Sequence, residues 1–361
     1  MTGLTVNLGE RSYPIHISSG FDNIGKVVAS IRPGKVLVVT DSNVERLHAN
    51  SCIEEIRKEG LEVLKFVFPA GEVSKNLGTV KEIYSVCMEN KFERKDTIVA
   101  LGGGVAGDIA GFAAATYLRG VNFIQVPTSL IAQCDSSVGG KVGVDFEGGK
   151  NLIGSFYQPN AVFININTLK TLPEREYISG LAEVIKHSVI KDKDFFRYLE
   201  ENTDEILNRR DEVLSYVIKI NCSIKSKVVE TDERENYLRA ILNFGHTVGH
   251  AIESVLNFSL LHGECISLGI AAACSIARKM SIVSKQDTER IIALLSGMRL
   301  PVVYKNLDTE KVYNQMFFDK KISEGKLNFI LPKRIGEVIQ CNDIPKDVIK
   351  EAIKQLTVKA D

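Results

Sequence analysis

A chain of 361 residues is longer than one hydrophobic core usually supports, so we expect two domains. Apolar residues make up 44% and charged residues 25% of the chain, as in an ordinary soluble globular protein. The 45 Lys and Arg residues balance 45 Asp and Glu residues, which argues against general affinity for nucleic acid or for an anionic membrane surface. Binding of anions must therefore depend on local clusters of cations.

The first 170 residues alternate strand and helix signals. Residues 5–8 and 13–18 form a candidate hairpin, and apolar runs predict further strands at 35–40, 62–68, 96–101, 121–126 and 161–167. Amphipathic or small-residue segments at 43–59, 76–90 and 104–117 predict the helices between them. Strands that alternate with helices indicate an open, mostly parallel, Rossmann-like α/β sheet.

From about residue 172 onward the apolar pattern has the period of a helix almost to the end of the chain. The exceptions are a candidate hairpin at 326–331 and 336–340, before a last helix at 346–355. We therefore predict an α/β domain at residues 1–170 and a mostly α-helical domain at 171–361, with the active site in the cleft between them.

The seven cysteines are scattered, and no two of them form a CxxC pair. An odd number without a disulfide framework, on a chain that shows no signal peptide, predicts reduced thiols and a cytoplasmic location. The longest uncharged apolar run, at residues 265–277, is too short to cross a bilayer and predicts a buried helix.

The run LGGGVAGD at residues 101–108 contains the pattern GxGxxG between a predicted strand and a predicted helix. Backbone N–H groups at such a helix start can hold a pyrophosphate, whereas tight helix–sheet packing is the alternative explanation for the glycines. The acidic residue usual about 20 positions further on is absent, because the next strand ends at Thr128 and Ser129. Asp41, at the end of an earlier strand, could hold the ribose instead, which predicts a dinucleotide-binding domain of variant topology.

Two glycine–lysine segments follow, DSSVGGK at 135–141 and GGKN at 148–151. Glycines beside lysines suggest a backbone shaped around an anion, and a flexible surface loop with solvated lysines is the alternative. If further cations converge with them, the set suits a small substrate that carries both phosphate and carboxylate. The candidate cations are Lys186, Lys225, Arg239, Lys320 and Lys321.

Residues 238–264 hold three of the six histidines, His246, His250 and His262. Apolar spacing predicts a helix at 240–256, on which His246 and His250 lie at i and i+4, about 6 Å apart at Cβ. With His262 after a turn they form a candidate zinc site, whereas incidental histidines on a solvated helix are the alternative. Glu183 and His187 also lie at i and i+4, and the spacing decides neither which of them could reach a metal nor whether His250 is a ligand or an acid–base group.

These segments, together with GLAEVIK at 180–186, NFGHTVGHAIE at 243–253 and HGE at 262–264, resemble the 3-dehydroquinate synthase family in order and spacing. The resemblance covers essentially the whole chain. It implies the shikimate-pathway step that converts 3-deoxy-D-arabino-heptulosonate 7-phosphate to 3-dehydroquinate and phosphate, with NAD and Zn2+ or Co2+ as cofactors. The implied route is transient oxidation by NAD, β-elimination of phosphate, re-reduction, ring opening and intramolecular aldol closure.

The resemblance also implies roles for single residues. The metal ligands are Glu183, His246 and His262, while His187 is structural and His250 lies near the leaving phosphate. Arg119 reaches the neighbouring site of a homodimer. The implied NAD contacts are Asp41, Glu72, Lys75, Gly104, Val105, Asp108, Thr128, Ser129, Lys141, Lys150, Thr168, Leu169, Lys170 and Thr171. The implied substrate contacts are Asp135, Lys141, Asn151, Lys186, Lys225, Arg239, Asn243, His250 and Lys320.

There are two departures from the family pattern, and the second leaves open how the Lys141–Asn151 loop packs. Ser129 stands where a second threonine is common and keeps the hydroxyl, whereas Val142 and Phe146 replace a threonine and a histidine in the loop before Asn151. Whether Lys320 or Lys321 contacts the substrate stays open. The alternatives are another sugar-phosphate cyclase of the inosose or valiolone synthase type, a metal-dependent polyol dehydrogenase, and an inactive NAD-binding regulator. The number of cations favours a substrate with two anionic groups, and the full set of motifs argues against the last two.

Overall fold

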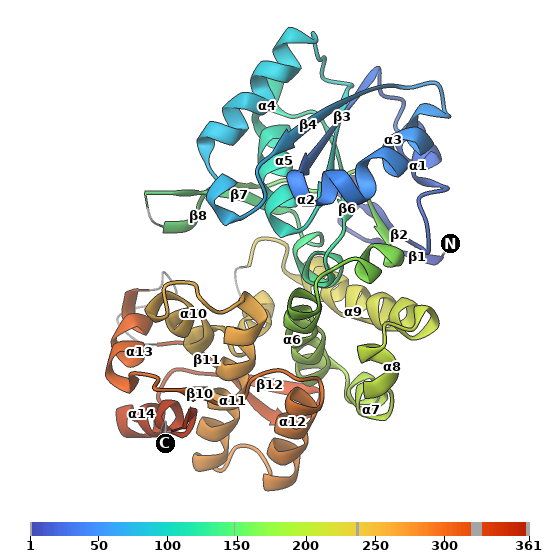
Figure 1. Cartoon of the computed structure of the whole chain (residues 1–361). Helices are drawn as coiled ribbons and strands as arrows, with labels where there is room; N and C mark the ends of the chain where they lie inside the picture. The colour runs from blue at the N-terminus through green and yellow to red at the C-terminus, as the bar shows by residue number, and fades with distance from the viewer. Residues whose placement is uncertain (1, 148, 236–237, 319–326, 359–361) are drawn as a thin grey trace. The chain divides into compact units, whose positions relative to one another are not determined.

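The computed structural model describes residues 2–147, 149–235, 238–318 and 327–358, and the chain forms two compact units (Figure 1). The first unit comprises Met1–Pro173 and Leu214–Arg234, and the second comprises Glu174–Val213 and Glu235–Asp361. This division differs from the two contiguous domains predicted from the sequence, because Leu214–Arg234 belongs to the first unit. Among the described residues, no helix is long and apolar enough to cross a membrane.

A seven-stranded sheet forms the centre of the first unit, in the order β1-β2-β9-β6-β5-β3-β4. Neighbouring strands are parallel except β1 and β2, which form the predicted opening hairpin. The predicted mostly parallel α/β sheet is therefore confirmed. The strands are β1 (Thr2–Val6), β2 (Tyr13–Ser18), β3 (Lys35–Asp41), β4 (Glu62–Phe68), β5 (Thr97–Gly102), β6 (Asn122–Pro127) and β9 (Ala161–Asn165).

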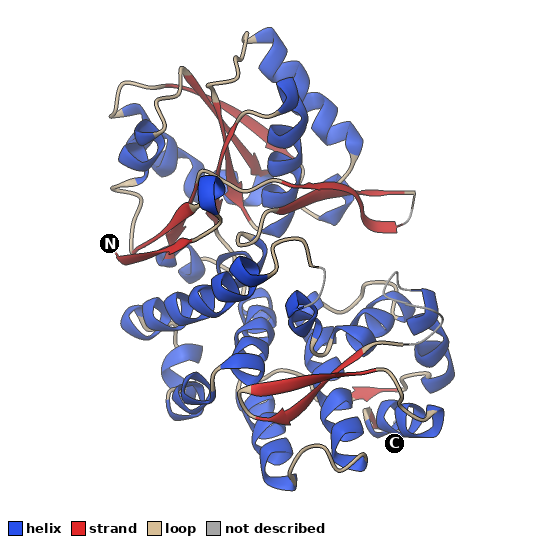
Figure 2. Cartoon of the chain, turned by 180° about the vertical axis from the view of Figure 1, so that it is seen from behind, coloured by secondary structure: helices blue, strands red, loops and turns tan. Residues whose placement is uncertain are grey.

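Alternate residues of the strands face two separate hydrophobic cores, because side chains of a strand point to opposite faces in turn. Val36 and Val38 of β3 pack in the core on the side of α1 (Ile24–Ser30) and α3 (Asn50–Arg57). Leu37 and Val39 pack in the core on the side of the other two helices. Helices thus cover both faces of the sheet, which explains the continuous apolar runs in its sequence (Figures 1 and 2). The helices of this second face are α4 (Leu77–Glu89) and α5 (Gly104–Thr116).

Two segments of this unit show detail that the sequence did not predict. The helix expected at 43–59 is present from Ser42 to Arg57, but a π-helical turn, Glu45–Ala49, lies between α2 (Ser42–Val44) and α3. The glycine–lysine segments, for which a flexible loop was one alternative, contribute Lys141 to β7 (Lys141–Phe146) and residues 149–151 to β8 (Gly149–Phe156). These two strands form a hairpin that extends from the sheet (Figure 2).

The second unit is mainly helical, as predicted. The uncharged run at 265–277 lies inside α11 (His262–Lys279) and is buried apart from Ser275. A hairpin of β11 (Phe329–Arg334) and β12 (Glu337–Cys341) confirms the predicted hairpin, and β10 (Tyr304–Lys305) pairs with β13 (Thr357–Val358). The other helices are α6 (Glu174–Lys191), α7 (Lys193–Glu201), α8 (Thr203–Leu207), α10 (His246–Val255), α12 (Lys285–Gly297), α13 (Thr309–Gln315), α14 (Lys346–Gln355), and α9 (Asp211–Thr231), which lies mostly in the first unit.

Candidate active site

Glu183 lies in the buried middle of α6, as does Lys186 one turn later, and each residue is 1% exposed. Charged groups are costly to bury unless they are paired. Lys186 Nζ forms an ion pair with Oε2 of Glu183. The second oxygen, Oε1, faces His246 and His262, so the carboxylate joins a cation to two imidazoles.

His246 and His250 come from α10, which begins later than predicted. The prediction of one helix at 240–256 is wrong, because Leu238–Asn243 forms a 3-10 helix and Gly245 then has a φ of 81°. Glycine suits this left-handed backbone, and a Cβ here would lie 2.7 Å from Cγ1 of Ile270. His246 therefore becomes the first residue of α10. Its spacing to His250 is retained, with the two ring centroids 5.0 Å apart.

His262 begins α11, and the next residue determines how close that helix comes to α6. Gly263 donates its backbone N–H to Oγ of Ser179 at 3.0 Å. A Cβ at position 263 would lie 1.8 Å from the carbonyl oxygen of Ser179, so only glycine permits this approach. Because Ser179 is one helical turn before Glu183, the contact places His262 next to that carboxylate.

Glu264 fixes the start of α11 from the other side. One carboxylate oxygen accepts the backbone N–H of Leu261 at 2.8 Å, which satisfies an N–H group just before the helix. Arg175 donates two hydrogen bonds of 2.7 Å to the same carboxylate. Gly263 and Glu264 of the HGE motif thus have structural roles, because both fix the position of His262.

The donor atoms of these residues form a compact group. Oε1 of Glu183 lies 3.8 Å from Nε2 of His246 and 3.6 Å from Nε2 of His262. The ligand nitrogens of His246, His250 and His262 lie within 4.8 Å of one another. Two overlapping donor sets therefore exist, one with Glu183 and one with His250. A carboxylate with two imidazoles is a ligand set of catalytic zinc, so the chemistry of these donors fits a metal ion.

His262 carries a proton at neutral pH in the metal-free site. Burial lowers its pKa, but hydrogen bonds and electrostatic attraction from Glu183 and Glu253 outweigh burial and raise the pKa to about 9. A metal ligand must be deprotonated, so a divalent cation at this nitrogen displaces that proton.

The other predicted residues of the second unit lie on α6 or shortly before α10 in the sequence. Arg239, which is 2% exposed, and Asn243 lie on the 3-10 helix directly before Gly245. His187 is fully buried on α6. Lys320 and Lys321 lie outside the described residues.

In the first unit, the glycines of LGGGVAGD have two different structural roles. Gly103, which has no side chain to cap the helix, precedes α5, and a Cβ at Gly104 would lie 3.3 Å from Oγ of Ser136. These two glycines leave the first N–H groups of α5 approachable by an anion. A Cβ at Gly107 would lie 2.7 Å from Oε1 of Gln125 in β6, so this glycine serves helix–sheet packing.

Asp41 lies beside this turn because of the strand order. It ends β3, which pairs with β5, and a Cβ at Gly102 would lie 3.4 Å from Oδ2 of Asp41. Its Oδ1 accepts the backbone N–H groups of Asn43 and Val44 at 2.8 and 3.1 Å. The carboxylate is therefore fixed next to the glycine turn, although it comes from an earlier strand.

Lys75 connects residues that were expected to contact two different ligands. Its Nζ lies 2.6 Å from Oδ2 of Asp108 and 2.5 Å from Oδ1 of Asn151. Burial lowers the pKa of Lys75, but attraction by Asp108 and Glu72 outweighs burial and raises the pKa. Asp145 supports both ends, since its carboxylate accepts the N–H of Asn151 at 2.7 Å and its own N–H donates to the Lys75 carbonyl.

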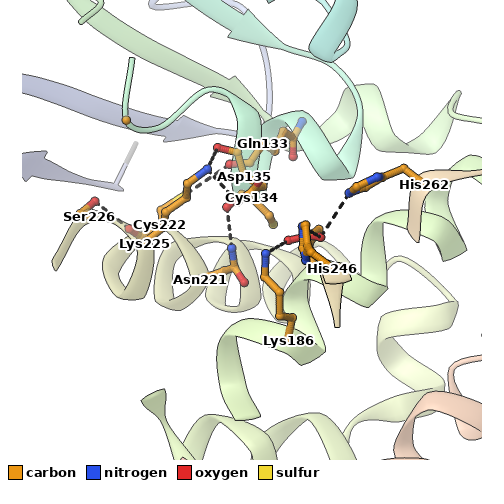
Figure 3. A network of polar contacts seen from close by, with 12 residues as sticks. Gln133, Cys134, Asp135, Lys186, Asn221, Cys222, Lys225, Ser226, His246 and His262 are labelled. Carbon is orange, nitrogen blue, oxygen red and sulfur yellow. Dashed lines mark hydrogen bonds and ion pairs between the residues drawn. The ribbon is translucent and has the colours of Figure 1, made fainter. Parts of the chain in front are cut away.

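The loop that begins at Asp135 is held by α9 (Figure 3). Lys225 Nζ lies 2.7 Å from Oδ1 of Asp135 and also donates to its backbone carbonyl. Asn221 donates to the carbonyl of Cys134 at 2.7 Å. These bonds explain why the middle of α9 belongs to the first unit.

The other predicted residues of the first unit are spread over several elements. Lys141 and Lys150 carry exposed side chains on the hairpin, and Arg119 has a left-handed φ of 66°. Buried Thr128 donates its N–H to Gly102, and Oγ of Ser129 accepts the N–H of Ala132. Thr168, Leu169 and Lys170 form a 3-10 turn that Thr171 follows, Glu72 lies 3.9 Å from Lys75, and Val105 lies in the first turn of α5.

Comparison with known proteins identifies the family. Residues 65–179 match a family model described as 3-dehydroquinate synthase N-terminal, and residues 180–322 match 3-dehydroquinate synthase C-terminal. The 3-dehydroquinate synthase of Acetivibrio thermocellus is 56% identical over 358 residues, 99% of both chains. That of Ruminiclostridium cellulolyticum is 53% identical over 354 residues, 98% of this chain and 99% of the other. The chain belongs to the 3-dehydroquinate synthase family.

Solved structures of related cyclases share this fold. A 2-deoxy-scyllo-inosose synthase complexed with carbaglucose-6-phosphate, NAD+ and Co2+ has a TM-score of 0.90 and 26% identity, over 98% of this chain and 100% of the other. The 2-epi-5-epi-valiolone synthase from Streptomyces hygroscopicus, with NAD+ and Zn2+ bound, has a TM-score of 0.88 and 25% identity, over 97% and 98%. A glycerol dehydrogenase from Schizosaccharomyces pombe, at 16% identity and a TM-score of 0.67, shares the fold alone.

Sequence reasoning missed the residues that support this family's motifs from other elements. Asn221 lies on a helix whose period gives no sign of its bond to the Asp135 loop. Buried Gln133 donates to the carbonyls of Pro127 and Asn165 and to Oγ1 of Thr168, and nothing in its sequence context marks it. Asp145 lies between the two glycine–lysine segments, and its role follows only from the β7–β8 hairpin.

Proposed function

We propose that this member of the 3-dehydroquinate synthase family converts 3-deoxy-D-arabino-heptulosonate 7-phosphate to 3-dehydroquinate and phosphate, with NAD and Zn2+ or Co2+ as cofactors. The observation that carries the proposal is 56% identity over 99% of the chain to a protein of that name. The related cyclases that hold NAD+ with Co2+ or Zn2+ support the choice of cofactors.

In this proposal Glu183, His246 and His262 hold the metal ion, which supplies a Lewis acid for a substrate hydroxyl when it is bound. Their helices place the donor atoms 3.6–3.8 Å apart around one carboxylate oxygen, so small shifts allow coordination at about 2 Å. His250, one turn after His246, is proposed to bind or protonate the leaving phosphate. Lys186 pairs with the second oxygen of Glu183 and offsets the charge of that buried carboxylate.

The first unit is proposed to bind NAD. Bound NAD would take a hydride from the substrate and later return it. Gly103 and Gly104 leave room for the pyrophosphate at the start of α5, and Asp41 beside them accepts hydrogen bonds from the ribose. Lys75, paired with Asp108, adds a buried cation near this end of the sheet. The predicted contacts at Thr168 and Thr171 follow the end of β9. In the sheet, β6 lies between β9 and β5.

The substrate carries a phosphate and a carboxylate, and this chain offers buried cations for both. Lys186, Arg239 and Lys225 are each less than 5% exposed, so water screens them weakly. Asp135 holds the ammonium of Lys225 in place. We propose that these side chains, with Asn151 and Asn243, orient one extended substrate so that only one conformation reacts.

We also propose that the enzyme is a homodimer in which Arg119 of one subunit contributes to the site of the other. Two consecutive left-handed residues, Leu118 and Arg119, support a special backbone position at this arginine. Sedimentation analysis tests the dimer, and mixing Arg119→Ala subunits with His262→Ala subunits tests the shared site. Partial recovery of activity in the mixture is expected, whereas no recovery contradicts the shared arginine. The cytoplasmic location stays a prediction.

The decisive experiment incubates the purified chain with 3-deoxy-D-arabino-heptulosonate 7-phosphate and substoichiometric NAD, with and without a chelator. Phosphate release and product carbons are followed together by NMR. Turnover beyond the NAD supplied, lost on chelation and restored by Zn2+, is the expected result. A folded, metal-loaded protein that gives no turnover contradicts the proposed substrate and points to another sugar phosphate.

A further inference from the structure

Glu253 is a buried carboxylate to which the proposed reaction gives no role. It lies on α10, seven residues after His246 and three after His250, so it is on the same side of the helix as both. Its side chain is 10% exposed. A carboxylate in such a place loses much of its hydration and needs a donor within the protein.

The imidazole of His262 lies next to this carboxylate. Oε2 of Glu253 lies 3.5 Å from Nδ1 of His262, and Nε2 of the same ring lies 3.6 Å from Oε1 of Glu183. The ring therefore lies between two carboxylates, one at each nitrogen. Nε2 faces Glu183, a candidate metal ligand, and Nδ1 faces Glu253 on α10.

We propose that Glu253 is a positioning residue that keeps the proton of His262 on Nδ1, so that Nε2 presents its lone pair to the metal. A neutral imidazole has one N–H, and the nitrogen without it is the metal ligand. A carboxylate that accepts the Nδ1 proton fixes the tautomer, orients the ring and makes Nε2 a stronger donor. This inference rests on the proposed function, because it requires a metal ion at Glu183, His246 and His262.

His246 shows the same arrangement with a weaker acceptor. Its Nδ1 lies 3.1 Å from the backbone carbonyl of Phe244, and its Nε2 faces Glu183. Both imidazoles thus direct Nε2 toward one carboxylate oxygen, and the Nδ1 of His262 lies beside a carboxylate. Glu253 adds a negative charge beside the candidate ligands, where Lys186 already offsets part of the charge of Glu183.

The affinity for zinc tests the role of Glu253. The dissociation constant is measured by competition with a chromophoric chelator for the parent protein, Glu253→Gln and the control Glu200→Gln. Glutamine keeps the size of the side chain but removes the charge, so we expect zinc to bind about 10–100-fold more weakly. Glu200 is also a partly buried carboxylate of the second unit, but it pairs with Arg290, so its variant is expected to bind zinc like the parent.

A measurement on the parent protein avoids any effect of substitution on folding. Long-range proton–nitrogen NMR of the zinc-loaded protein is expected to show His262 protonated at Nδ1 and bound to metal through Nε2. Zinc on Nδ1, or a Glu253→Gln affinity equal to that of the parent, overturns the role of Glu253 alone. If the parent does not bind zinc, the proposed metal function fails, and this inference fails with it.

Discussion

Glu183, His246 and His262 lie on closely packed helices, whereas Asp41, Lys75 and Asn151 lie on turns and on a largely exposed hairpin. The helical group depends on contacts between backbones, since a Cβ at Gly269 would lie 1.8 Å from the carbonyl oxygen of Gly245. The group in the first unit depends instead on bonds between side chains, such as those of Lys75 to Asp108 and Asn151.

This difference indicates a division of tasks. Rigid helix packing can hold metal ligands near their final positions before a metal binds, so little reorganisation follows. Turns and a hairpin joined by side-chain bonds can adjust when a nucleotide or a sugar phosphate replaces those bonds. Each of the following predictions tests one side of this comparison.

The largest effect is expected for His262→Ala, which removes one ligand from the rigid group. Zinc supplies several kcal/mol of Lewis-acid stabilisation, so activity should fall about a thousandfold or more, with zinc absent from the purified variant. Metal analysis, circular dichroism and kcat/KM measure the effect. His16→Ala, on β2 of the first unit, serves as the control and should retain zinc. Full activity of His262→Ala in metal-free buffer would contradict the assignment of zinc to this site.

Arg239→Ala should mainly weaken substrate binding. The loss of a hydrogen bond to a charged group costs about 1.5–3 kcal/mol, so KM should rise about 10–100-fold while kcat changes less. Steady-state kinetics measure both constants. Arg299→Ala is the control, because Arg299 forms an ion pair with Glu174 in which both side chains are more than 60% exposed. Kinetics of Arg239→Ala that match the control remove this arginine from the site.

Gly269→Ala tests the helix packing directly. The added Cβ would lie 1.8 Å from an oxygen of Gly245, so α10 and α11 must separate, at a cost of about 1–3 kcal/mol in the free energy of unfolding. Urea denaturation measures the cost, and zinc titration shows whether the ligands move apart. Gly297→Ala, whose Cβ would lie 3.9 Å from Thr203, is the control and should be neutral or slightly stabilising. Equal stability of the two variants contradicts the packing role.

The smallest effect compares thiol labelling in the two units. Burial raises the pKa of Cys52 and Cys87 in the first unit to about 12, so neither forms thiolate at pH 8 unless the chain opens locally. Cys265, three residues after His262, is also fully buried. Chelation should therefore speed iodoacetamide labelling of Cys265 a few-fold and leave Cys52 and Cys87 unchanged, as peptide mass mapping reports. Equal acceleration at all three sites contradicts separate responses of the two units.

Local patterns in the sequence were sufficient to predict most of the elements. Continuous apolar and β-branched runs predicted the strands of the central sheet, and the i, i+4 spacing predicted that His246 and His250 lie close together. The choice of Glu183 as a ligand came from the family resemblance rather than from spacing, and the structure shows both Glu183 and His250 near the other two histidines.

The remaining features depend on contacts between residues far apart in the sequence. The apolar period continues through residues 240–256, so it hides the break at Gly245, where the backbone is left-handed and a Cβ would meet Ile270. The β7–β8 hairpin was missed because glycines and lysines are typical of loops, while its pairing depends on register across the turn. Likewise, helical period cannot show that Asn221 and Lys225 bond to the Asp135 loop.

The assignment of Leu214–Arg234 to the first unit has a consequence for protein synthesis. The chain crosses from one unit to the other after Pro173, after Val213 and after Arg234. Asn221 leaves the ribosome 87 residues after its partner Cys134. The loop at Asp135 can therefore form its bonds to α9 only after that helix has been synthesised. A nascent chain that stops at Pro173 carries every strand of the large sheet yet cannot complete this unit. Translation must therefore pass through part of the helical unit before the nucleotide-binding fold is finished, and a gene split at the apparent domain boundary would separate two halves of one folding unit.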